Sequence, residues 1–440
     1  MKKYLAYIRE LFFFSLPVIA GKVSEILFGI GDVIVAGRYS TIVLGAMGVA
    51  SAFLFPVIIF GVGVISAISP IKARKLGAGE STDHIPFSSL ALSAFIGVIL
   101  TAGVLLVTRF LVPMIGYEAE FEYLVQTYLY ICCFSIIPAL IFSAIKELLL
   151  ARSHTVVPNL LIFLFNFFNI AMNVLLMFTF GLGIAGAAIA TLLSRSLMAV
   201  LLFLYSRRKT QWHWKVCNDT VFEVLKMGIP TGGISVVVAA IFAIVSILVG
   251  RMSVTASATN TILINVTSFS FMIPLALSGV TAVKVGHAYG AGEILKIKEY
   301  TISASIIGVA FAIIAGTIFL ALPEWVLRIF TNQPEVIAYG TVLLLYIAFY
   351  QVPDALQEIF VGALRGIGET TVPLVLSFIS IWLIGLTTGC YLAYVKDMGA
   401  AGLWLGLSSG LVFLGIFLGT FFAIKVRRLE RQYGTAHLSG

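Results

Sequence analysis

Leu76–Glu80 (LGAGE) and Tyr289–Glu293 (YGAGE) are two copies of one short sequence, 213 residues apart in a chain of 440. Nearly the same offset, 213 to 216 residues, joins further matched pairs: Pro17 and Pro230, Pro138 and Pro353, Pro158 and Pro373, and Gly183 and Gly399. An offset this steady indicates one unit repeated head to tail. In a membrane protein a duplicated bundle usually places its substrate site between the copies, so function is expected there.

The composition identifies a polytopic membrane protein. Hydrophobic residues make up 60% of the chain, charged residues 11%, and the mean hydropathy is +1.07. Long apolar stretches follow one another, each above the roughly 20 residues that a membrane-spanning helix needs. Lipid offers no partner to open strand edges, and the short alternating segments of a β-barrel do not occur. The twelve predicted spans are 11–36, 43–71, 86–112, 121–145, 157–180, 183–206, 221–250, 256–283, 300–322, 336–363, 372–395 and 400–424.

The sequence therefore predicts an all-α fold of twelve transmembrane helices in two pseudo-symmetric lobes of six. We predict an amino-terminal lobe at 1–206, a cytoplasmic linker at 207–220, a carboxyl-terminal lobe at 221–424 and a cytoplasmic tail at 425–440. Because six is an even number, both lobes should cross the membrane in the same direction, as parallel repeats do.

The basic residues alternate from loop to loop. The net charge is +8, and most lysines and arginines lie near the termini and in every second loop. The loops between these hold only Arg38, Arg109, Arg251, Arg328 and Lys396. The positive-inside rule puts both termini and the Gly-Ala-Gly-Glu loops in the cytoplasm, so we predict a multi-pass protein of the plasma membrane. This pattern accounts for the positive charge without a nucleic-acid partner.

The Gly-Ala-Gly-Glu loops have a structural interpretation. A Gly-x-Gly sequence can bind phosphate, but here it follows helices and not strands, so that signal is weak. A glycine after the last helical turn suits a helix C-cap. We therefore predict that both loops cap the helices before them.

Three charged residues lie inside the first span: Lys22, Glu25 and Asp32. A charge at the centre of a membrane helix costs about 2.5–3.5 kcal/mol on insertion scales, so each needs a partner or a function. At about 100° per residue they form one stripe, which should face water or the bundle interior. Lys22 and Glu25 can neutralise each other, which leaves Asp32 as the leading functional candidate. Arg195 of the sixth span is expected to neutralise a carboxylate that the sequence does not identify.

The fifth span places three amides on one face, because Asn166, Asn169 and Asn173 follow the spacing i, i+3, i+7. Hydrogen bonding between helices is the usual role of asparagine in a membrane helix. Together with Asp32, and with Thr191 of the sixth span, these oxygens also form a hard-ligand set that suits Na⁺. The pattern leaves both interpretations open.

The tenth span carries Asp354, Gln357 and Glu358 on one face. Asp354 follows Pro353, which frees backbone groups at that depth. Glu358 lies nearer the predicted cytoplasmic end. Aromatic residues are abundant in the spans, and a few of them could line a pocket for a flat organic cation.

Several of these features occur together in one family of transporters. They are the six-plus-six repeat, the Gly-Ala-Gly-Glu loops after spans two and eight, and the motifs Asn169-x-x-x-Asn173, Tyr350-Gln351-x-x-Asp354 and Arg365-Gly366-x-Gly368. With them the chain resembles the multidrug and toxic compound extrusion (MATE) family, and most closely its bacterial NorM-type branch. The resemblance covers nearly the whole chain.

The resemblance implies a cation-coupled antiporter of the bacterial inner membrane. Such a protein exports organic, often aromatic and cationic, compounds in exchange for Na⁺ or H⁺, by alternating access between its lobes. We expect a monomer in the lipid bilayer, with small organic cations as partners, no enzymatic activity and no cofactor besides the coupling ion.

The resemblance also assigns roles to residues. Coupling to the cation would fall to Asp32, supported by Glu25, and to Asp354. If the coupling ion is Na⁺, its ligands would be Asp32, Asn169, Asn173 and Thr191. The residues of the substrate cavity would be Asp32, Tyr350, Asp354 and Gln357.

One departure from the family pattern concerns the seventh span. NorM-type members have a glutamate eight residues after the proline of this span, where this chain has Val238. The second-lobe equivalent of Asp32 is also a valine, Val245. The prolines, glycines and Gly-Ala-Gly-Glu loops are therefore repeated, but the charged residues are not. The sequence does not support a cation site built on a seventh-span glutamate.

Two other functions fit parts of the sequence. A lipid-linked oligosaccharide flippase of the same superfamily would share the fold, but its cavity would be rich in basic groups, whereas the acids here favour cationic cargo. An intramembrane aspartyl protease would match Gly29-x-Gly31-Asp32 and Pro138–Leu140. Its partner aspartate should lie on an earlier helix, however, and no aspartate precedes Asp32.

Overall fold

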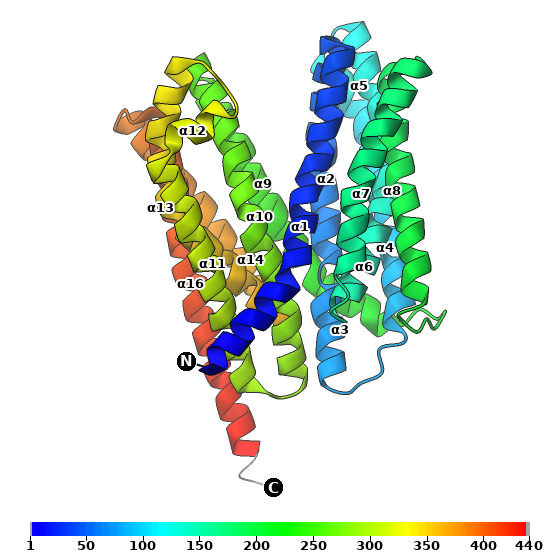
Figure 1. Ribbon diagram of the computed structural model, residues 1–440, viewed down its shortest axis with the longest axis vertical. Helices are drawn as coiled ribbons and strands as arrows, with labels where there is room; N and C mark the ends of the chain where they lie inside the picture. The colour runs from blue at the N-terminus through cyan, green and yellow to red at the C-terminus, as the bar shows by residue number, and fades with distance from the viewer. Residues whose placement is uncertain (1, 437–440) are drawn as a thin grey trace. The chain divides into compact units, whose positions relative to one another are not determined.

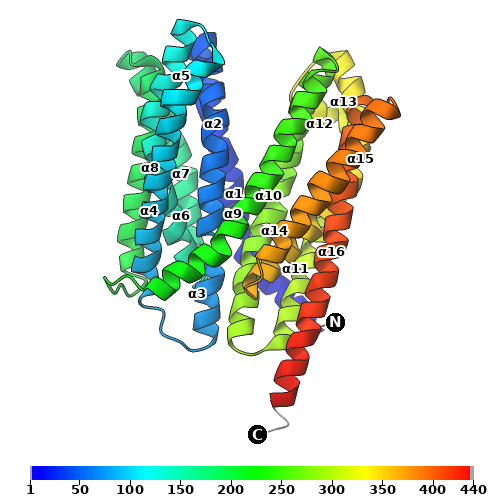
Figure 2. The same ribbon diagram turned by 180° about the vertical axis from the view of Figure 1, so that it is seen from behind.

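The computed structural model describes residues 2–436, most of which lie in helices (Figure 1, Figure 2). Within this range twelve helical segments are long and apolar enough to cross a membrane, which confirms the predicted spans. Several helices extend well beyond the apolar stretches, as at Gly77 and Gly290. The last helix runs through the first part of the predicted tail to Ala436, and residues 437–440 of that tail lie outside the described range, as does residue 1.

The chain divides into two compact units. The amino-terminal unit comprises Leu16–Lys75 and Glu80–Gly232, and the carboxyl-terminal unit comprises Met1–Ser15, Leu76–Gly79 and Gly233–Gly440. The first helix therefore contributes to both units.

Each span is built from one helix or from consecutive helical pieces. Spans one to six are formed by α1 (Lys2–Tyr39), α2 (Thr41–Ile65) with α3 (Ile68–Gly77), α4 (Ile85–Leu106), α5 (Ala119–Cys132) with α6 (Ile136–Leu150), α7 (Val156–Val174) and α8 (Gly183–Arg207). Spans seven to ten are formed by α9 (Asn218–Gly250), α10 (Val254–Gly290), α11 (Ile294–Ala321) and α13 (Pro334–Gly366). The short α12 (Pro323–Arg328) precedes α13, and span twelve is α16 (Gly399–Ala436).

Three spans contain π-helical turns. In span three α4 continues into the π segment η1 (Val107–Leu111). The other two are the corresponding spans five and eleven. Span five continues from α7 into the π segment η4 (Leu175–Thr179). Span eleven consists of α14 (Thr371–Phe378), the π segment η5 (Ile379–Leu386), α15 (Thr387–Cys390) and the π segment η6 (Tyr391–Val395). Such turns are rare and mostly occur at functional sites.

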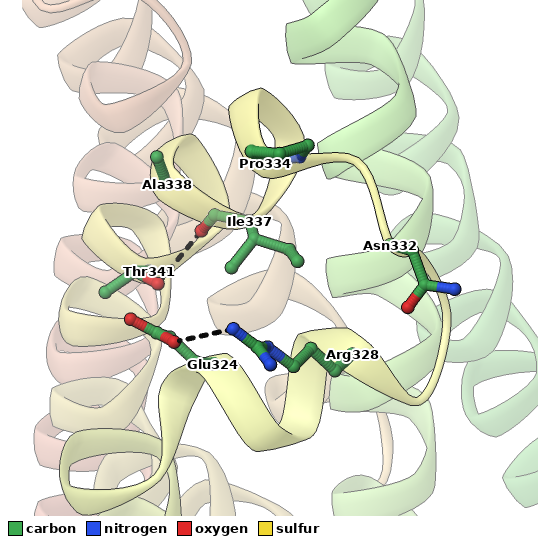
Figure 3. Close-up of a pocket in the computed structure, with 7 residues that line it drawn as sticks. All are labelled: Glu324, Arg328, Asn332, Pro334, Ile337, Ala338 and Thr341. Atoms are coloured by element: carbon green, nitrogen blue, oxygen red, sulfur yellow. Dashed lines mark hydrogen bonds and ion pairs between the residues drawn. The ribbon is translucent and has the colours of Figure 1, made fainter.

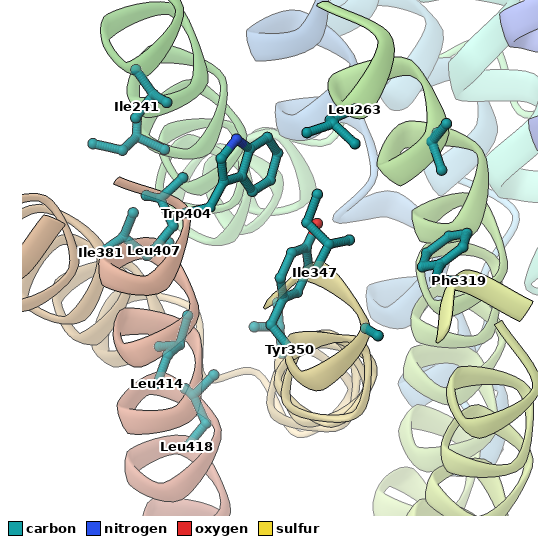
Figure 4. Close-up of a cluster of buried hydrophobic side chains, with 14 of the residues drawn as sticks. Ile241, Leu263, Phe319, Ile347, Tyr350, Ile381, Trp404, Leu407, Leu414 and Leu418 are labelled. Atoms are coloured by element: carbon teal, nitrogen blue, oxygen red, sulfur yellow. The ribbon is translucent and has the colours of Figure 1, made fainter. Parts of the chain in front are cut away.

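In the carboxyl-terminal unit α13 packs against α10, α11 and α16. Figure 4 shows the core between them, where the ring of Tyr350 stacks on Trp404 at a centroid distance of 6.3 Å and an interplanar angle of 10°. Trp404 is fully buried, and its indole N–H donates to Asn260 Oδ1 at 3.2 Å. Burial of so large an aromatic side chain with its polar atom satisfied stabilises this core.

The Gly-Ala-Gly-Glu loops cap their helices as predicted. Gly79 adopts a left-handed φ of 73°, and the Glu80 N–H donates to the Lys75 carbonyl at 2.9 Å. The second copy repeats this geometry, with Gly292 at a φ of 71° and the matching bond from Glu293. Glycine reaches this conformation without the clash that a Cβ would make.

A second pair of corresponding helix ends has the same cap geometry, but the residue with a left-handed φ differs between them. After α13, Gly368 has a φ of 90°, and the Glu369 N–H donates to Leu364 at 2.9 Å. At the corresponding end of α6, Ser153 has a φ of 61° and the His154 N–H donates back to the helix. The first repeat thus places a serine where the second has glycine.

Candidate cation and substrate site

The amino-terminal unit joins Asp32 of α1 to the amide face of α7. Asn173 Nδ2 donates to Asp32 Oδ1 at 2.5 Å and to Asn169 Oδ1 at 3.1 Å. Both asparagines are fully buried. The structure therefore brings together three of the four predicted Na⁺ ligands through one amide group.

Asn166, one turn earlier on α7, connects the same two helices in a different way. Its Nδ2 donates to the Ser24 carbonyl of α1 at 2.8 Å. This is the interhelical bond expected of a membrane asparagine. The amide face of α7 is therefore consistent with both interpretations of the sequence. Asn166 joins α7 to α1, whereas Asn169 and Asn173 lie at the Asp32 carboxylate.

Several polar atoms of this region have no hydrogen-bond partner among residues 2–436. They are Asn166 Oδ1, Asn169 Nδ2, Asn173 Oδ1 and Thr191 Oγ1. A buried polar atom left unpaired costs about 1–3 kcal/mol, so such groups usually have a partner in the working protein. Three of the four atoms are oxygens, which together with the Asp32 carboxylate are the ligand chemistry of an alkali cation.

Thr191 belongs to α8, which packs against α7. Its side chain is 2% exposed, and within the described part of the chain no hydrogen bond joins its hydroxyl to Asp32 or to the asparagines. Its place as a fourth ligand therefore stays a prediction. The π segment η4 begins two residues after Asn173, so the helix is widened where the amides end.

Glu25 is held by two lysines. Lys22 of α1 lies 2.8 Å from one of its carboxylate oxygens, and Lys146 of α6 lies 2.7 Å from the other. We call Lys22, Glu25 and Lys146 the ion triad. The Lys22–Glu25 pair was predicted, but Lys146 was not, although a charge at the end of an apolar span was a visible signal. The predicted support of Glu25 for cation coupling stays untested by this geometry.

Arg195 combines a hydrogen bond with a longer-range electrostatic interaction. Its Nη1 donates to Ser135 Oγ at 2.8 Å. Its positive charge also acts on the Asp32 carboxylate, without a direct ion pair between the two in the described part of the chain, so Asp32 is the acid that the sequence did not identify.

In the carboxyl-terminal unit the predicted residues lie along α13. Gln357 Nε2 donates to Asp354 Oδ1 at 3.3 Å. Tyr350, one turn before Asp354, is 4% exposed and packs into the core on Trp404. The amide of Gln351 has a buried Nε2 without a partner among the described residues. Asp354 and Gln357 thus form a hydrogen-bonded polar pair on the same helix as the buried Tyr350. The roles of Tyr350, Asp354 and Gln357 in substrate binding stay predictions.

A hollow of about 450 Å³ lies in the same unit between α12 and the start of α13 (Figure 3). It is lined by Glu324, Arg328, Asn332, Pro334, Ile337, Ala338 and Thr341. Glu324 and Arg328 form an ion pair at 3.4 Å within it. None of the predicted site residues lines this hollow, so it is separate from the polar groups of α13.

Comparisons with known proteins agree with the fold and the repeat. The MatE family model matches residues 17–175 and 230–391, once in each repeat. The chain is 30% identical to "Probable multidrug resistance protein NorM" of Rhizobium meliloti (strain 1021), over 96% of this chain and 95% of that protein. It is 29% identical to "Multidrug resistance protein NorM" of Vibrio vulnificus (strain YJ016), over 98% of each.

Solved structures show the same architecture. The crystal structure of MATE in complex with MaL6 superposes with a TM-score of 0.90 at 19% identity, over 97% of each chain. An outward-facing multidrug resistance MATE family transporter superposes with a TM-score of 0.88, over 96% of this chain and 97% of that one. At this identity the likeness shows the fold. With the family match in both halves, the chain belongs to the MatE family, which confirms the resemblance found in its motifs.

Proposed function

We propose that this protein is a cation-coupled multidrug exporter. The observation that carries the proposal is the Asp32 carboxylate, bonded to Asn173 and accompanied by buried amide and hydroxyl oxygens that lack partners. The relatives' names, which describe multidrug resistance proteins, support the cargo class. No chemistry on a covalent bond is needed for this role, so we propose transport and not catalysis.

The proposed exchange depends on competition for one charge. Na⁺ would be held by Asp32 with the oxygens of Asn169, Asn173 and Thr191, whereas H⁺ would be held by the carboxylate alone. A cationic cargo would compete for the same carboxylate. Because a ligand shifts an equilibrium only by its differential affinity for the two states, exclusive binding of ion or cargo would couple their movements.

The second acidic position would act in the other repeat. Asp354, supported by Gln357, supplies a carboxylate one helical turn after Tyr350, where a cationic cargo would be held by charge. Because position 238 is a valine and not a glutamate, a cation site in the second repeat would depend on Asp354. We propose alternating access of the two repeats, a monomeric protein of the bacterial inner membrane, and cytoplasmic termini, on the basic-loop pattern.

The deciding experiment is ethidium export from proteoliposomes. Purified protein is tested under a Na⁺ gradient alone and then under a pH gradient alone, with empty liposomes as the control. We expect export under one of the two gradients. No response to either would refute the antiporter proposal, and a response to one would identify the coupling ion.

A further inference from the structure

The linker between the two repeats carries basic side chains without acidic partners. It joins the end of α8 to the start of α9 at one end of the amino-terminal unit (Figure 2). Residues 207–220 contain four basic residues and one acid, Asp219, which is a net charge of +3. The four basic side chains are all exposed, and none of them belongs to an ion pair among residues 2–436. They are Arg207, Arg208, Lys209 and Lys215.

Aromatic rings orient one of these basic groups. The guanidinium of Arg207 lies over the ring of Trp214, 5.9 Å from its centroid. Trp214 in turn packs edge-on against Phe87 of α4 at 5.2 Å, and its ring lies 6.2 Å from that of Trp212. A guanidinium that is stacked on a ring keeps the N–H donors along its edge available to an anion. Arg207 is therefore oriented before any ligand binds.

The backbone of the linker is fixed to the rest of the unit near both of its ends. Arg152 Nη1 donates to the Lys209 carbonyl at 3.1 Å, and the Cys217 N–H donates to Ser88 Oγ at 2.9 Å. Order that exists before binding lowers the entropy cost of binding. The linker is therefore a structured surface, although its sequence predicted only a polar connection.

Apolar side chains are exposed beside the basic ones. Trp214 is 58% exposed and Val216 is 43% exposed, and Phe222 in the second turn of α9 is 69% exposed. Tryptophan at the end of a membrane span typically lies at the level of the lipid headgroups, because its ring is apolar and its N–H is polar. Basic and exposed apolar side chains in one segment are typical of a surface that meets the membrane interface.

We propose that this surface binds the headgroup of an anionic phospholipid. We call Arg207, Arg208, Lys209, Trp214 and Lys215 the linker surface. Its arginines donate hydrogen bonds to the phosphate oxygens, which is the charge-assisted contact that guanidinium groups favour, and Trp214 lies beside the glycerol and the upper acyl chain. The positive charge selects an anionic lipid over a neutral one, and the exposed ring selects a lipid over a free phosphate. The inference goes beyond the export proposal, because it uses none of the residues assigned to ion or cargo.

The test measures lipid binding to the purified full-length protein by native mass spectrometry. The probes are phosphatidylglycerol and phosphatidylcholine with the same acyl chains, so that they differ in the headgroup alone. Arg207→Gln and Arg208→Gln each remove one charge, whereas Trp214→Leu removes the ring at constant charge. Arg38→Gln is the matched control, since Arg38 is an exposed basic residue of the same unit in the last turn of the first span.

We expect the wild-type protein to bind phosphatidylglycerol more tightly than phosphatidylcholine. Arg207→Gln and Arg208→Gln should each weaken binding of phosphatidylglycerol about fivefold and leave phosphatidylcholine unchanged. Trp214→Leu should weaken binding of phosphatidylglycerol about two- to fivefold, because Arg207 loses its stacking partner. Arg38→Gln should alter neither lipid. The melting temperature of each variant in phosphatidylcholine nanodiscs checks that it is folded.

Several results would overturn the inference in distinguishable ways. If Arg38→Gln weakens binding of phosphatidylglycerol as much as Arg207→Gln does, net charge attracts the lipid and the linker surface is not a site. Equal affinity of the wild-type protein for both lipids would exclude headgroup recognition. Two competitors complete the test. Displacement of phosphatidylglycerol by an equal concentration of inorganic phosphate would assign the surface to a free anion, and displacement by a short single-stranded DNA would assign it to nucleic acid.

Discussion

Asn173 donates its amide N–H to the Asp32 carboxylate at 2.5 Å, while its own carbonyl oxygen is buried without a partner among residues 2–436. The two side chains thus present a carboxylate and an unpaired amide oxygen in one place. A bound cation would satisfy both, and would recover the roughly 1–3 kcal/mol that an unpaired buried group costs. This relationship makes Asp32 the first residue to test.

Asp32→Asn should abolish export at unchanged expression. The substitution keeps the shape of the side chain but removes the charge that ion and cargo are proposed to share. Ethidium efflux from cells and from proteoliposomes measures the effect. Asp219→Asn, which removes an exposed carboxylate at the start of α9, should behave as wild type. Wild-type export by Asp32→Asn would contradict the proposed site.

Thr191→Val should weaken Na⁺ binding about tenfold if the coupling ion is Na⁺, because it deletes a ligand oxygen at constant shape. Its hydroxyl has no partner among the described residues, so stability without Na⁺ should not fall. Thermal melting in detergent, with and without Na⁺, measures both quantities. Thr101→Val is the contrast, since Thr101 donates to the Cys133 carbonyl at 3.1 Å and its loss should cost about 1 kcal/mol. Equal Na⁺ stabilisation of Thr191→Val and wild type would exclude Thr191 as a ligand.

Asp354→Asn should weaken ethidium binding by about tenfold, the effect of losing one charged contact. The side chain keeps a carbonyl oxygen that can accept the Gln357 amide, so folding should be preserved. Ethidium fluorescence titration of the purified protein gives the dissociation constant. Glu335→Gln removes an exposed acid from the first turn of the same helix and serves as the control. If both variants lose affinity equally, general charge and not Asp354 attracts the cargo.

Ser153→Gly should stabilise the protein by about 0.5–1 kcal/mol, and Gly368→Ser should destabilise it by about 1–2 kcal/mol. Both residues have a left-handed φ at equivalent helix ends, where a side chain is strained. The two exchanges together test whether the left-handed backbone at this position favours glycine, because they make the same chemical change in opposite directions. The melting temperature in detergent reports the result, and shifts of the same sign would argue against backbone strain as the cause.

The fold was predictable because its signals are local. Apolar stretches reveal spans, and the glycines of the Gly-Ala-Gly-Glu loops reveal caps, since each depends on residues within a few positions. The charges were also visible, because a lysine or acid in an apolar stretch is conspicuous. Their pairing was visible only for Lys22 and Glu25, which are neighbours on one helix.

The contacts between helices were not predictable in the same way. Lys146 meets Glu25 across 121 residues of chain, and Trp404 meets Asn260 across 144. Nothing local fixes which faces of two helices meet, because that depends on how all side chains pack. Arg195 shows the same limit, because the sequence identified neither Ser135, to which its guanidinium donates, nor Asp32, the acid on which its charge acts.

The π segment η5 has a consequence for the symmetry of the two repeats. Pro158 and Pro373 are 215 residues apart, whereas the starts of η4 and η6, Leu175 and Tyr391, are 216 apart. The second repeat therefore holds one residue more between these points, which is where η5 lies. A π turn closes from i to i+5, so it takes in one residue more than an α turn and the span can keep its ends in register.

Beyond that extra residue the two repeats use corresponding positions for different purposes. At the offset of 216, Asn169 and Asn173 correspond to Gly385 and Gly389. A Cβ on Gly406 of α16 would come within 2.2 Å of the Gly389 Cα atom, so the second repeat brings two backbones into contact there. The first repeat therefore has polar amide side chains at these positions, whereas the second repeat has glycines at which two helices cross closely. We therefore expect this helix crossing to allow less movement than the polar face of the first repeat.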